Sequence, residues 1–448
     1  MQAYEIITKK RDGFELTDEE VKFIVDGFVS GEVADYQMSA FAMAVYFKGL
    51  NANELSALTT AMVNSGDTID LSEVGGITAD KHSSGGVGDK TTLVLAPMVA
   101  AAGLKVAKFS GRGLGFTGGT IDKLEAIPGF RTDLSREEFI TQIREIGLAV
   151  SGASGDIDPA DKKLYALRDV TGTVESIPLI ASSIMSKKLA IKNDIIALDV
   201  KVGSGAFMKT IEEATILSKM MVGIGTDAGR NTVAVISSME EPLGYAIGNA
   251  VEVIESLETL KGNGPEDLTS LCVELGANML AQAMILSGEK DLADYEIALA
   301  ESKHEMNRVI SDGSAIDAFR KMIEMQGGDA SFIDSSEKLS SHKYSMKVEA
   351  DSTGNISSIN AEEIGLAVKN LGGGREKKED VIEPGVGVIL RKKIGAKVEK
   401  GDILAEVLAN DEEKGADAVS RISKAFVISD ESVEIPSLVI AVITKRDL

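Results

Sequence analysis

Two glycine- and hydroxyl-rich segments have residue types that could hold an oxyanion. Residues 80–92 read DKHSSGGVGDKTT, and residues 108–120 read KFSGRGLGFTGGT. Glycine lets backbone N–H groups approach an anion closely, while Ser, Thr and Lys side chains donate further hydrogen bonds. The apolar run from Thr91 to Ala102 predicts a helix whose positive N-terminal end would face the first segment. The two segments therefore predict a phosphate site, with donors from Lys81, Ser83, Thr92, Lys108, Ser110 and Thr120.

Three other motifs in the same segments are weaker. Residues 88–91 imitate a nucleoside-triphosphate loop, but Asp89 separates the glycine from the lysine. Residues 113–118 match the dinucleotide pattern G-x-G-x-x-G, yet the first strand–helix unit already lies upstream and Arg112 crowds the turn. Asp80, His82 and Ser83 could suggest a hydrolytic triad, but side chains so close in sequence rarely point together, and no nucleophile elbow is present.

Composition narrows the class of protein. The 448 residues carry a net charge of −23, which argues against a general nucleic-acid surface. Against this acidity, five cations near the two segments form a local basic island that a small anion could find: Lys81, Lys90, Lys105, Lys108 and Arg112. The single cysteine, Cys272, excludes an intramolecular disulfide, and the three histidines cannot form a His/Cys metal cluster. Because no apolar run reaches the roughly 20 residues of a membrane span and no signal peptide is evident, we expect a cytoplasmic protein without membrane or nucleic-acid partners.

The elements around these segments predict an α/β fold in three parts. Residues 17–63 read as helices that begin with a capping box at Thr17, and from Ile77 short apolar strands alternate with glycine loops and helices. Strands are expected at 105–109, 194–202 and 231–237, and short strands with glycine turns follow Asp334. We predict a small all-helical domain (1–65 and 162–192), a large α/β phosphate-binding domain with a central mixed sheet (66–161 and 193–335), and a C-terminal β-rich α+β domain (336–448).

The sequence also resembles a known family. Residues 110–125, SGRGLGFTGGTIDKLE, resemble the signature of the thymidine and pyrimidine-nucleoside phosphorylases, and residues 81–89, KHSSGGVGD, are similar to their phosphate loop. The resemblance spans essentially the whole chain. It implies reversible phosphorolysis of uridine, thymidine and deoxyuridine to free base and (deoxy)ribose 1-phosphate. Inorganic phosphate would be the co-substrate, no organic cofactor would be needed, and the helical domain would bind the base and contribute to a homodimer.

The resemblance assigns roles to further residues. Arg168, Ile180, Ser183 and Lys187 resemble the base-binding residues, with Arg168 and Lys187 countering charge on the leaving pyrimidine. Ser183 and Lys187 are four residues apart, so on a helix they share one face. His82 is a third catalytic candidate, for proton donation to the base or its polarisation, with substrate orientation as the alternative. Lys108 resembles the broad-specificity enzymes, whereas strict thymidine phosphorylases tend to carry methionine there.

A potassium site is also implied by the resemblance. In family relatives, carbonyl groups and one carboxylate from two segments hold the ion, and these positions correspond here to Gly88, Lys90, Leu243, Ala246 and Glu255. A lysine at position 90 could offer only its carbonyl oxygen, and its charge would need to point away from the ion. We therefore predict a potassium ion among these residues. Of the five, Lys90 is the one whose side-chain charge argues against a bound cation.

Alternative functions remain open at this point. Within the family, a strict thymidine phosphorylase is the nearest alternative, and an anthranilate-type phosphoribosyltransferase shares the helical-plus-α/β plan. Residues 395–405 resemble the hammerhead of lipoyl and biotinyl carrier domains, but no exposed lysine lies at a suitable hairpin tip upstream. A dinucleotide-dependent oxidoreductase would explain the glycine pattern alone.

Overall fold

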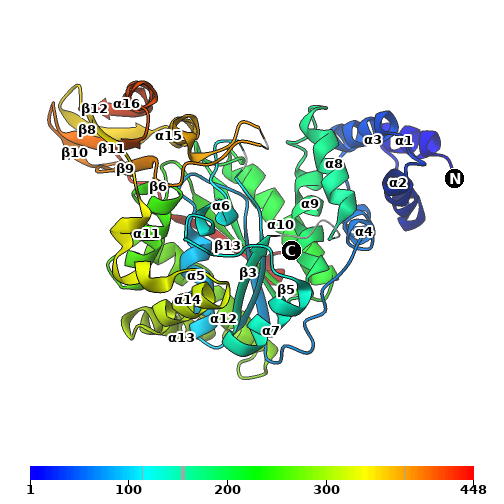
Figure 1. The fold of residues 1–448 in the computed structure, drawn as a ribbon. Coiled ribbons are helices and arrows are strands. Elements are labelled where there is room, and N and C mark those ends of the chain that lie inside the picture. The colour runs from blue at the N-terminus through cyan, green and yellow to red at the C-terminus, as the bar shows by residue number, and fades with distance from the viewer. Residues whose placement is uncertain (114, 153–156, 378) are drawn as a thin grey trace.

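The computed structural model describes residues 1–113, 115–152, 157–377 and 379–448, and it has the predicted fold class: a helical part, an α/β part and a β-rich part (Figure 1). The helical part combines the first four helices with two from the middle of the chain: α1 (Ala3–Arg11), α2 (Asp18–Ser30), α3 (Asp35–Lys48), α4 (Ala52–Val63), α8 (Pro159–Asp169) and α9 (Ile177–Ala190). Helix α8 packs on α2 and α3, and α9 packs on α4, so this middle segment of the chain packs on the N-terminal helices.

Local sequence signals explain most of these helix boundaries. Thr17 caps α2 with the predicted capping box, in which its side chain accepts from the Glu20 N–H and the Glu20 carboxylate accepts from the Thr17 N–H. Helix α1 was not predicted, because its polar and apolar residues alternate without a helical stripe. A contact with another helix stabilises α1: Lys10 is buried and donates to both carboxylate oxygens of Glu54 in α4, at 2.7 and 2.9 Å.

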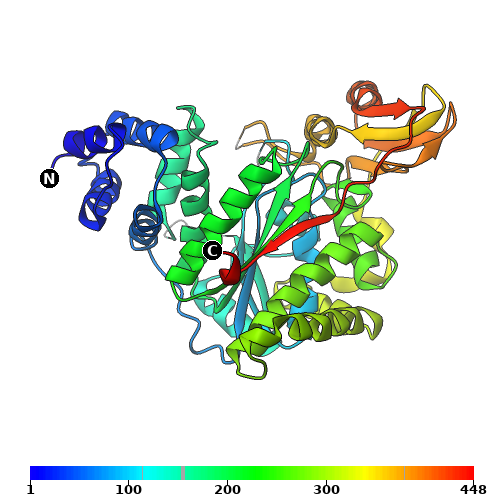
Figure 2. The same cartoon turned by 180° about the vertical axis from the view of Figure 1, so that it is seen from behind.

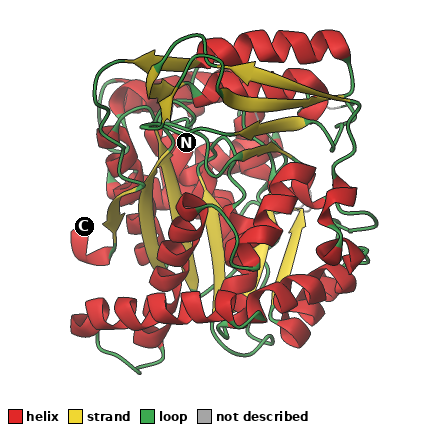
Figure 3. Ribbon diagram, turned by 90° about the vertical axis from the view of Figure 1, so that its left-hand side faces the viewer, coloured by secondary structure: helices red, strands yellow, loops and turns green. Residues whose placement is uncertain are grey.

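A six-stranded mixed sheet forms the centre of the molecule (Figure 3). Its order is β13 (Val439–Ile443), β5 (Asn231–Ser238), β4 (Ile195–Val202), β1 (Thr78–Ser83), β2 (Lys105–Ser110) and β3 (Leu148–Gly152). The five strands from β5 to β3 are parallel, and β13 is antiparallel. Residues 336–448 were predicted to form one domain, but Figure 2 shows the end of the chain crossing back to the sheet, where β13 pairs with β5. This strand is one of the short strands that were predicted after Asp334, but its partner β5 is distant in the sequence, so the pairing could not be predicted from the residues around β13.

Helices cover both faces of this sheet: α5 (Thr91–Ala101), α6 (Thr120–Leu124), α7 (Arg136–Ile146), α10 (Ile211–Asp227), α11 (Ala250–Leu260), α12 (Glu266–Leu286), α13 (Tyr295–Ser311) and α14 (Ser314–Met325). Helix α12 is long and apolar enough to cross a membrane by length and composition alone. However, it packs against α5, α13, β4 and β5, and most of it is buried. It is therefore a core helix of the α/β part.

The β-rich part contains two antiparallel sheets. One has the order β6 (Ala246–Gly248), β9 (Gly387–Leu390), β11 (Ile403–Ala409) and β7 (Tyr344–Glu349), and the other the order β10 (Lys397–Val398), β8 (Gly354–Ile359) and β12 (Phe426–Ser429). Helices α15 (Ala361–Val368) and α16 (Glu412–Ala425) pack on each other. Short helical turns lie at 292–294, 330–334, 336–339, 369–373 and 445–447. Strand β6 comes from the α/β segment, so the two parts share a sheet.

Candidate active site

A cavity of about 1040 Å³ opens at the carboxyl ends of β1, β2 and β4 and is bounded on its other side by α8 and α9. Strands β2 and β3 extend from β1 in one direction, and β4 and β5 extend in the other. The crevice at such a reversal of strand order is the usual ligand site of an open parallel sheet. Both predicted glycine-rich segments and both predicted base-binding helices line this one cavity.

Five of the six predicted phosphate donors line the cavity: Ser83, Thr92, Lys108, Ser110 and Thr120. Lys81 is not among the residues that line the cavity. Its ammonium group donates to the Thr91 hydroxyl and pairs with the carboxylates of Asp199 at 3.1 Å and Asp89 at 3.8 Å. These carboxylates outweigh the effect of burial and raise the pKa of Lys81. Lys81 therefore supports the loop.

Asp89 brings a negative charge to the edge of the phosphate segment. The Ser83 hydroxyl donates to its carboxylate, and the Thr91 hydroxyl donates at 2.6 Å. Burial opposes ionisation, but Lys81, Lys201 and these hydroxyl groups hold the pKa of Asp89 well below its usual range. A hydroxyl has one proton to donate. Ser83 must therefore release Asp89 before it can donate to an incoming oxyanion.

Lys108 and Lys188 share one buried carboxylate. Asp80 lies 2.7 Å from the Lys188 ammonium and 3.6 Å from that of Lys108, which also donates to the Lys81 carbonyl. Burial lowers the pKa of Lys108 to about 7; the positive charges of Lys188 and Lys81 act in the same direction, and Asp80 opposes them. Lys108 therefore titrates near neutral pH. Lys188 also lines the cavity but was not singled out from the sequence.

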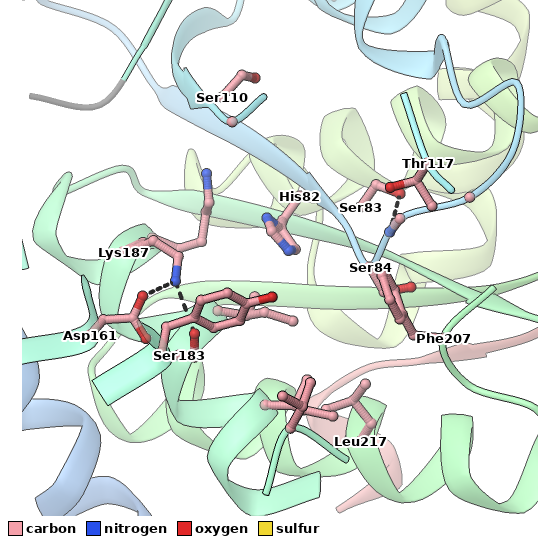
Figure 4. A pocket seen from close by; sticks show the side chains of 18 of the residues that line it. His82, Ser83, Ser84, Ser110, Thr117, Asp161, Ser183, Lys187, Phe207 and Leu217 are labelled. Carbon is pink, nitrogen blue, oxygen red and sulfur yellow. Dashed lines mark hydrogen bonds and ion pairs between the residues drawn. The ribbon is translucent and has the colours of Figure 1, made fainter. Parts of the chain in front are cut away.

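His82 lies between the two groups of polar residues, with Lys187 on one side and Ser83 on the other (Figure 4). Burial and the charges of Lys188, Lys108 and Lys187 lower its pKa well below 6.5. The imidazole is therefore neutral near pH 7. It can donate a hydrogen bond from one ring nitrogen, whereas full proton donation would require an imidazolium ion that its surroundings disfavour.

The opposite wall of the cavity presents Lys187 and Ser183 from α9. The Lys187 ammonium donates to the Ser183 hydroxyl at 3.0 Å and to the Asp161 carboxylate of α8 (Figure 4). This contact agrees with the predicted common helix face. Asp161 was missed, although its position seven residues before Arg168 places it on the same side of the predicted helix. It fixes where the Lys187 charge can point.

Arg168 is the largest fully buried side chain of the described residues. Its guanidinium group donates to the carbonyl oxygens of Thr173 at 3.1 Å, Val174 at 2.6 Å and Leu179 at 3.0 Å. Burial lowers its pKa to about 10. Three of its five N–H groups are thus used by Leu179 and the loop before α9. Arg168 also lines the cavity. Ile180, one turn into α9, contributes an apolar part of the same wall.

The basic island predicted from the sequence is largely neutralised. Arg112 pairs with Glu125 at 2.6 Å and Asp122 at 3.0 Å, and Lys105 contacts only the Arg144 carbonyl at 3.4 Å among its described hydrogen bonds. Lys81 and Lys90 are also paired with carboxylates. The partners of Arg112 lie within the same 110–125 segment, whereas Asp199 and Glu255, which pair with Lys81 and Lys90, come from distant elements that a charge count along the chain could not reveal. Leu114, within the second segment, lies outside the described residues.

The predicted potassium residues meet, but the predicted ion does not fit among them. The ammonium group of Lys90 donates to the carbonyl oxygens of Leu243 at 2.7 Å and Ala246 at 2.8 Å and to the Glu255 carboxylate at 2.6 Å. Gly88 lies against the same group, since a Cβ there would come within 2.6 Å of the Leu243 oxygen. A potassium ion would have to share these oxygens with a like-charged group. The lysine side chain thus points into the site, opposite to the expectation that its charge would turn away.

Several further cavity residues had no recognised sequence signal: Tyr46, Tyr165, Glu175, Phe207, Lys209 and Leu217. They come from α3, α8, α10 and the loops beside them, and only the folded chain brings them together. Phe207 and Leu217 line the floor beneath Ser84 (Figure 4). Phe207 packs directly against the polar loops: a Cβ at Gly85 would lie 3.1 Å from its ring, and the ring centroid is 5.6 Å from that of Phe116.

Comparisons with known proteins agree with this arrangement. Residues 4–66 match the glycosyl transferase family helical bundle domain, residues 75–316 the a/b domain of that family, and residues 355–429 the pyrimidine nucleoside phosphorylase C-terminal domain. The pyrimidine-nucleoside phosphorylase of Geobacillus stearothermophilus is 51% identical over 98% of this chain and 99% of its own length, and that of Staphylococcus epidermidis is 52% identical over 99% and 100%. Among solved structures, anthranilate phosphoribosyltransferase from Thermus thermophilus matches 72% of this chain and 99% of its own, with a TM-score of 0.57 and 17% identity, which is a likeness of fold. The chain belongs to the pyrimidine-nucleoside phosphorylase family.

Proposed function

We propose that this protein catalyses the reversible phosphorolysis of pyrimidine nucleosides to the free base and (deoxy)ribose 1-phosphate. One observation carries the proposal: a single cavity joins two glycine- and hydroxyl-rich loops to a cationic helix face on a different part of the chain. The loops suit an inorganic oxyanion, and the helix face suits a planar base with carbonyl oxygens. The 51% identity to a pyrimidine-nucleoside phosphorylase over nearly the full length supports the same reaction.

The reaction requires opposite charges to develop at the two ends of the cavity. A phosphate oxygen attacks the anomeric carbon while the bond from that carbon to the base nitrogen breaks, and the bonding electron pair leaves with the base. The sugar passes through an oxocarbenium-like state. Negative charge that grows on the pyrimidine carbonyl oxygens is stabilised best by fixed donors placed before the reaction begins.

The described residues support a division of roles. Ser83, Thr92, Lys108, Ser110 and Thr120 would bind phosphate. On the other wall, Lys187, Arg168 and Ser183 would bind the base carbonyls and edge, with Ile180 packing on the ring. His82, neutral and between the two sites, would polarise a carbonyl oxygen of the leaving base through a hydrogen bond.

We propose that uridine, thymidine and deoxyuridine are all substrates. The support is Lys108, whose side chain reaches the cavity beside the predicted phosphate site and offers a polar partner to a ribose 2′-hydroxyl group. A strict thymidine phosphorylase is the alternative. The two differ in one measurable way: the strict enzyme would release thymine but no uracil from uridine.

The deciding experiment measures base release from uridine, deoxyuridine and thymidine by chromatography, with and without inorganic phosphate. We expect release of all three bases only with phosphate, together with formation of the corresponding sugar 1-phosphate. Equal release without phosphate would indicate hydrolysis, and no release from any nucleoside would refute the proposal. Lys187→Met serves as the control protein, because it removes the cation at the base site and keeps the side-chain volume.

We further propose a cytoplasmic homodimer that associates through the helical part. The support is a group of exposed aromatic side chains on its outer helices, namely Tyr4 on α1 and Tyr36 and Phe47 on α3, which are 70%, 77% and 74% exposed. The buried free thiol of Cys272 is consistent with a reducing compartment. Sedimentation of Tyr36→Lys against the unmodified protein tests the association.

A further inference from the structure

Lys90 fills a small cage of oxygen atoms behind the phosphate segment. Its ammonium group has three N–H donors, and three acceptors lie at 2.6 to 2.8 Å: the carbonyl oxygens of Leu243 and Ala246 and the Glu255 carboxylate. The N–H groups of Tyr245 and Ala246 donate to the same carboxylate at 2.9 and 3.1 Å. Each of the three ammonium donors thus has its own acceptor.

The cage is also balanced in charge. The Lys90 side chain is fully buried and Glu255 is 11% exposed, so the pair lies in a region of low dielectric constant. The neighbouring carboxylates have their own cations: Glu252 pairs with Lys123 at 2.9 Å. Asp267 pairs with Lys393 at 3.0 Å. Lys393 also lies 3.5 Å from Glu241. Within the cage itself, the ammonium group of Lys90 meets the single carboxylate of Glu255, which is one positive charge for one negative charge.

Backbone packing leaves the cage little room to change. A Cβ atom at Gly244 would lie 2.2 Å from a carboxylate oxygen of Glu255 and 2.9 Å from the Lys90 nitrogen. The φ angles of Gly88 and Gly244 are +72° and +68°, in the left-handed region that favours glycine. A side chain at Gly244 would therefore collide with the cage, and one at Gly88 would collide with the Leu243 carbonyl oxygen that forms part of it.

We propose that Lys90 is a built-in cation, which takes the place of a monovalent metal ion at this oxygen cage and makes the fold of the phosphate segment independent of potassium. Lys90 directly follows Asp89 of the phosphate segment and precedes α5, whereas Leu243 to Ala246 lead into β6 of the C-terminal sheet. The ammonium group thus fastens the phosphate segment to the β-rich part. A covalently attached cation is present at every salt concentration, whereas a bound ion stabilises in proportion to its occupancy.

The first test uses the unmodified protein. Its thermal unfolding midpoint is measured in choline chloride and in potassium chloride at equal ionic strength, over a range of concentrations. We expect the two salts to give the same midpoint at each concentration. A midpoint that rises with potassium, saturates and does not rise with choline would overturn the proposal. This measurement needs neither a variant nor nucleoside turnover, so it is independent of the proposed function.

The second test opens the cage. Lys90→Thr removes the ammonium group and leaves a hydroxyl oxygen, and Lys90→Met removes the charge but fills the space of the stem. We expect both variants to unfold several degrees lower than the unmodified protein in choline chloride. Potassium should raise the midpoint of Lys90→Thr in a saturable way and leave that of Lys90→Met unchanged. If Lys90→Thr folds but its unfolding midpoint does not change with potassium, the oxygens do not form a cation site and the proposal is overturned. If this variant does not fold, the first test decides.

Discussion

The protonation state of Lys108 should control oxyanion affinity. Burial lowers its pKa to about 7, so about nine in ten molecules carry the charge at pH 6 and about one in thirty at pH 8.5. A hydrogen bond from a charged group contributes about 1.5–3 kcal/mol, or about 10- to 150-fold in affinity. Combining the two, we expect the affinity for a dianion to fall about 8- to 25-fold between these pH values.

Sulfate is the appropriate probe, because its charge does not change over this range as that of phosphate does. Isothermal titration of sulfate at several pH values measures the affinity directly. His82 does not titrate in this window, since burial and its lysine neighbours hold its pKa well below 6.5. The pH dependence therefore reports on Lys108.

Two comparisons can refute this reasoning. Lys108→Met should bind sulfate weakly and with no pH dependence between 6 and 8.5, so a variant that keeps the wild-type slope would assign the titration to another group. A wild-type affinity that stays constant over the range would show that no change in the charge of Lys108 controls sulfate binding. The same pKa shift affects the free energy of unfolding. Between about pH 7 and 10 the unfolded chain keeps the Lys108 proton that the folded protein has lost, so this group makes the folded protein more stable as the pH rises. A lysine whose pKa is raised by an ion pair would have the opposite effect.

Three further outcomes are expected. Lys187→Met should lower kcat/KM about 10²- to 10³-fold, because it removes a fixed donor at the base. Asp161→Asn should have an intermediate kcat/KM, and both variants should bind sulfate as tightly as the unmodified protein. Unchanged kinetics of Lys187→Met would refute the proposed role of Lys187 at the base. His82→Ala should lower kcat more than it raises the KM for phosphate, and wild-type turnover would exclude a catalytic role. Because His82 is neutral, the kcat profile should show no inflection from it between pH 6 and 8. Lys10→Met should lower the free energy of unfolding by about 3–5 kcal/mol, because the buried Glu54 carboxylate loses its cation. Urea unfolding followed by circular dichroism measures this loss, and the double variant with Glu54→Leu should recover part of it. An unchanged free energy of unfolding in Lys10→Met would contradict the importance of the pair.

The sequence predicted the features that depend on neighbours along the chain. The capping box at Thr17 marks the observed start of α2, and the strand expected at 194–202 is the fully buried strand β4. Local spacing also placed Ser183 and Lys187 on one helix face. These signals are physical properties of a few consecutive residues, so they can be recognised in the sequence before the fold is known.

Features that depend on distant parts of the chain could not be predicted in this way. The Lys81 ammonium group pairs with Asp199 of β4, and nothing in the sequence around Lys81 indicates this partner. Likewise β13 has an ordinary strand sequence, and only the fold shows that it pairs with β5. The direction of a long cationic side chain is decided by which carboxylate is buried beside it. The spacing of residues along the sequence does not contain that information.

The cations around the cavity differ in how completely they are neutralised. Lys81 has two carboxylate neighbours, Asp89 and Asp199, although Lys201 shares the second of these at 2.8 Å. On the β2 side, by contrast, Asp80 alone serves both Lys108 and Lys188 among the described ion pairs, so one positive charge is in excess there. That excess, together with burial, is the reason that Lys108 gives up its proton near pH 7. A dianion that enters beside Ser110 would reverse the balance and return the proton, so the ligand itself would restore the charge that binds it.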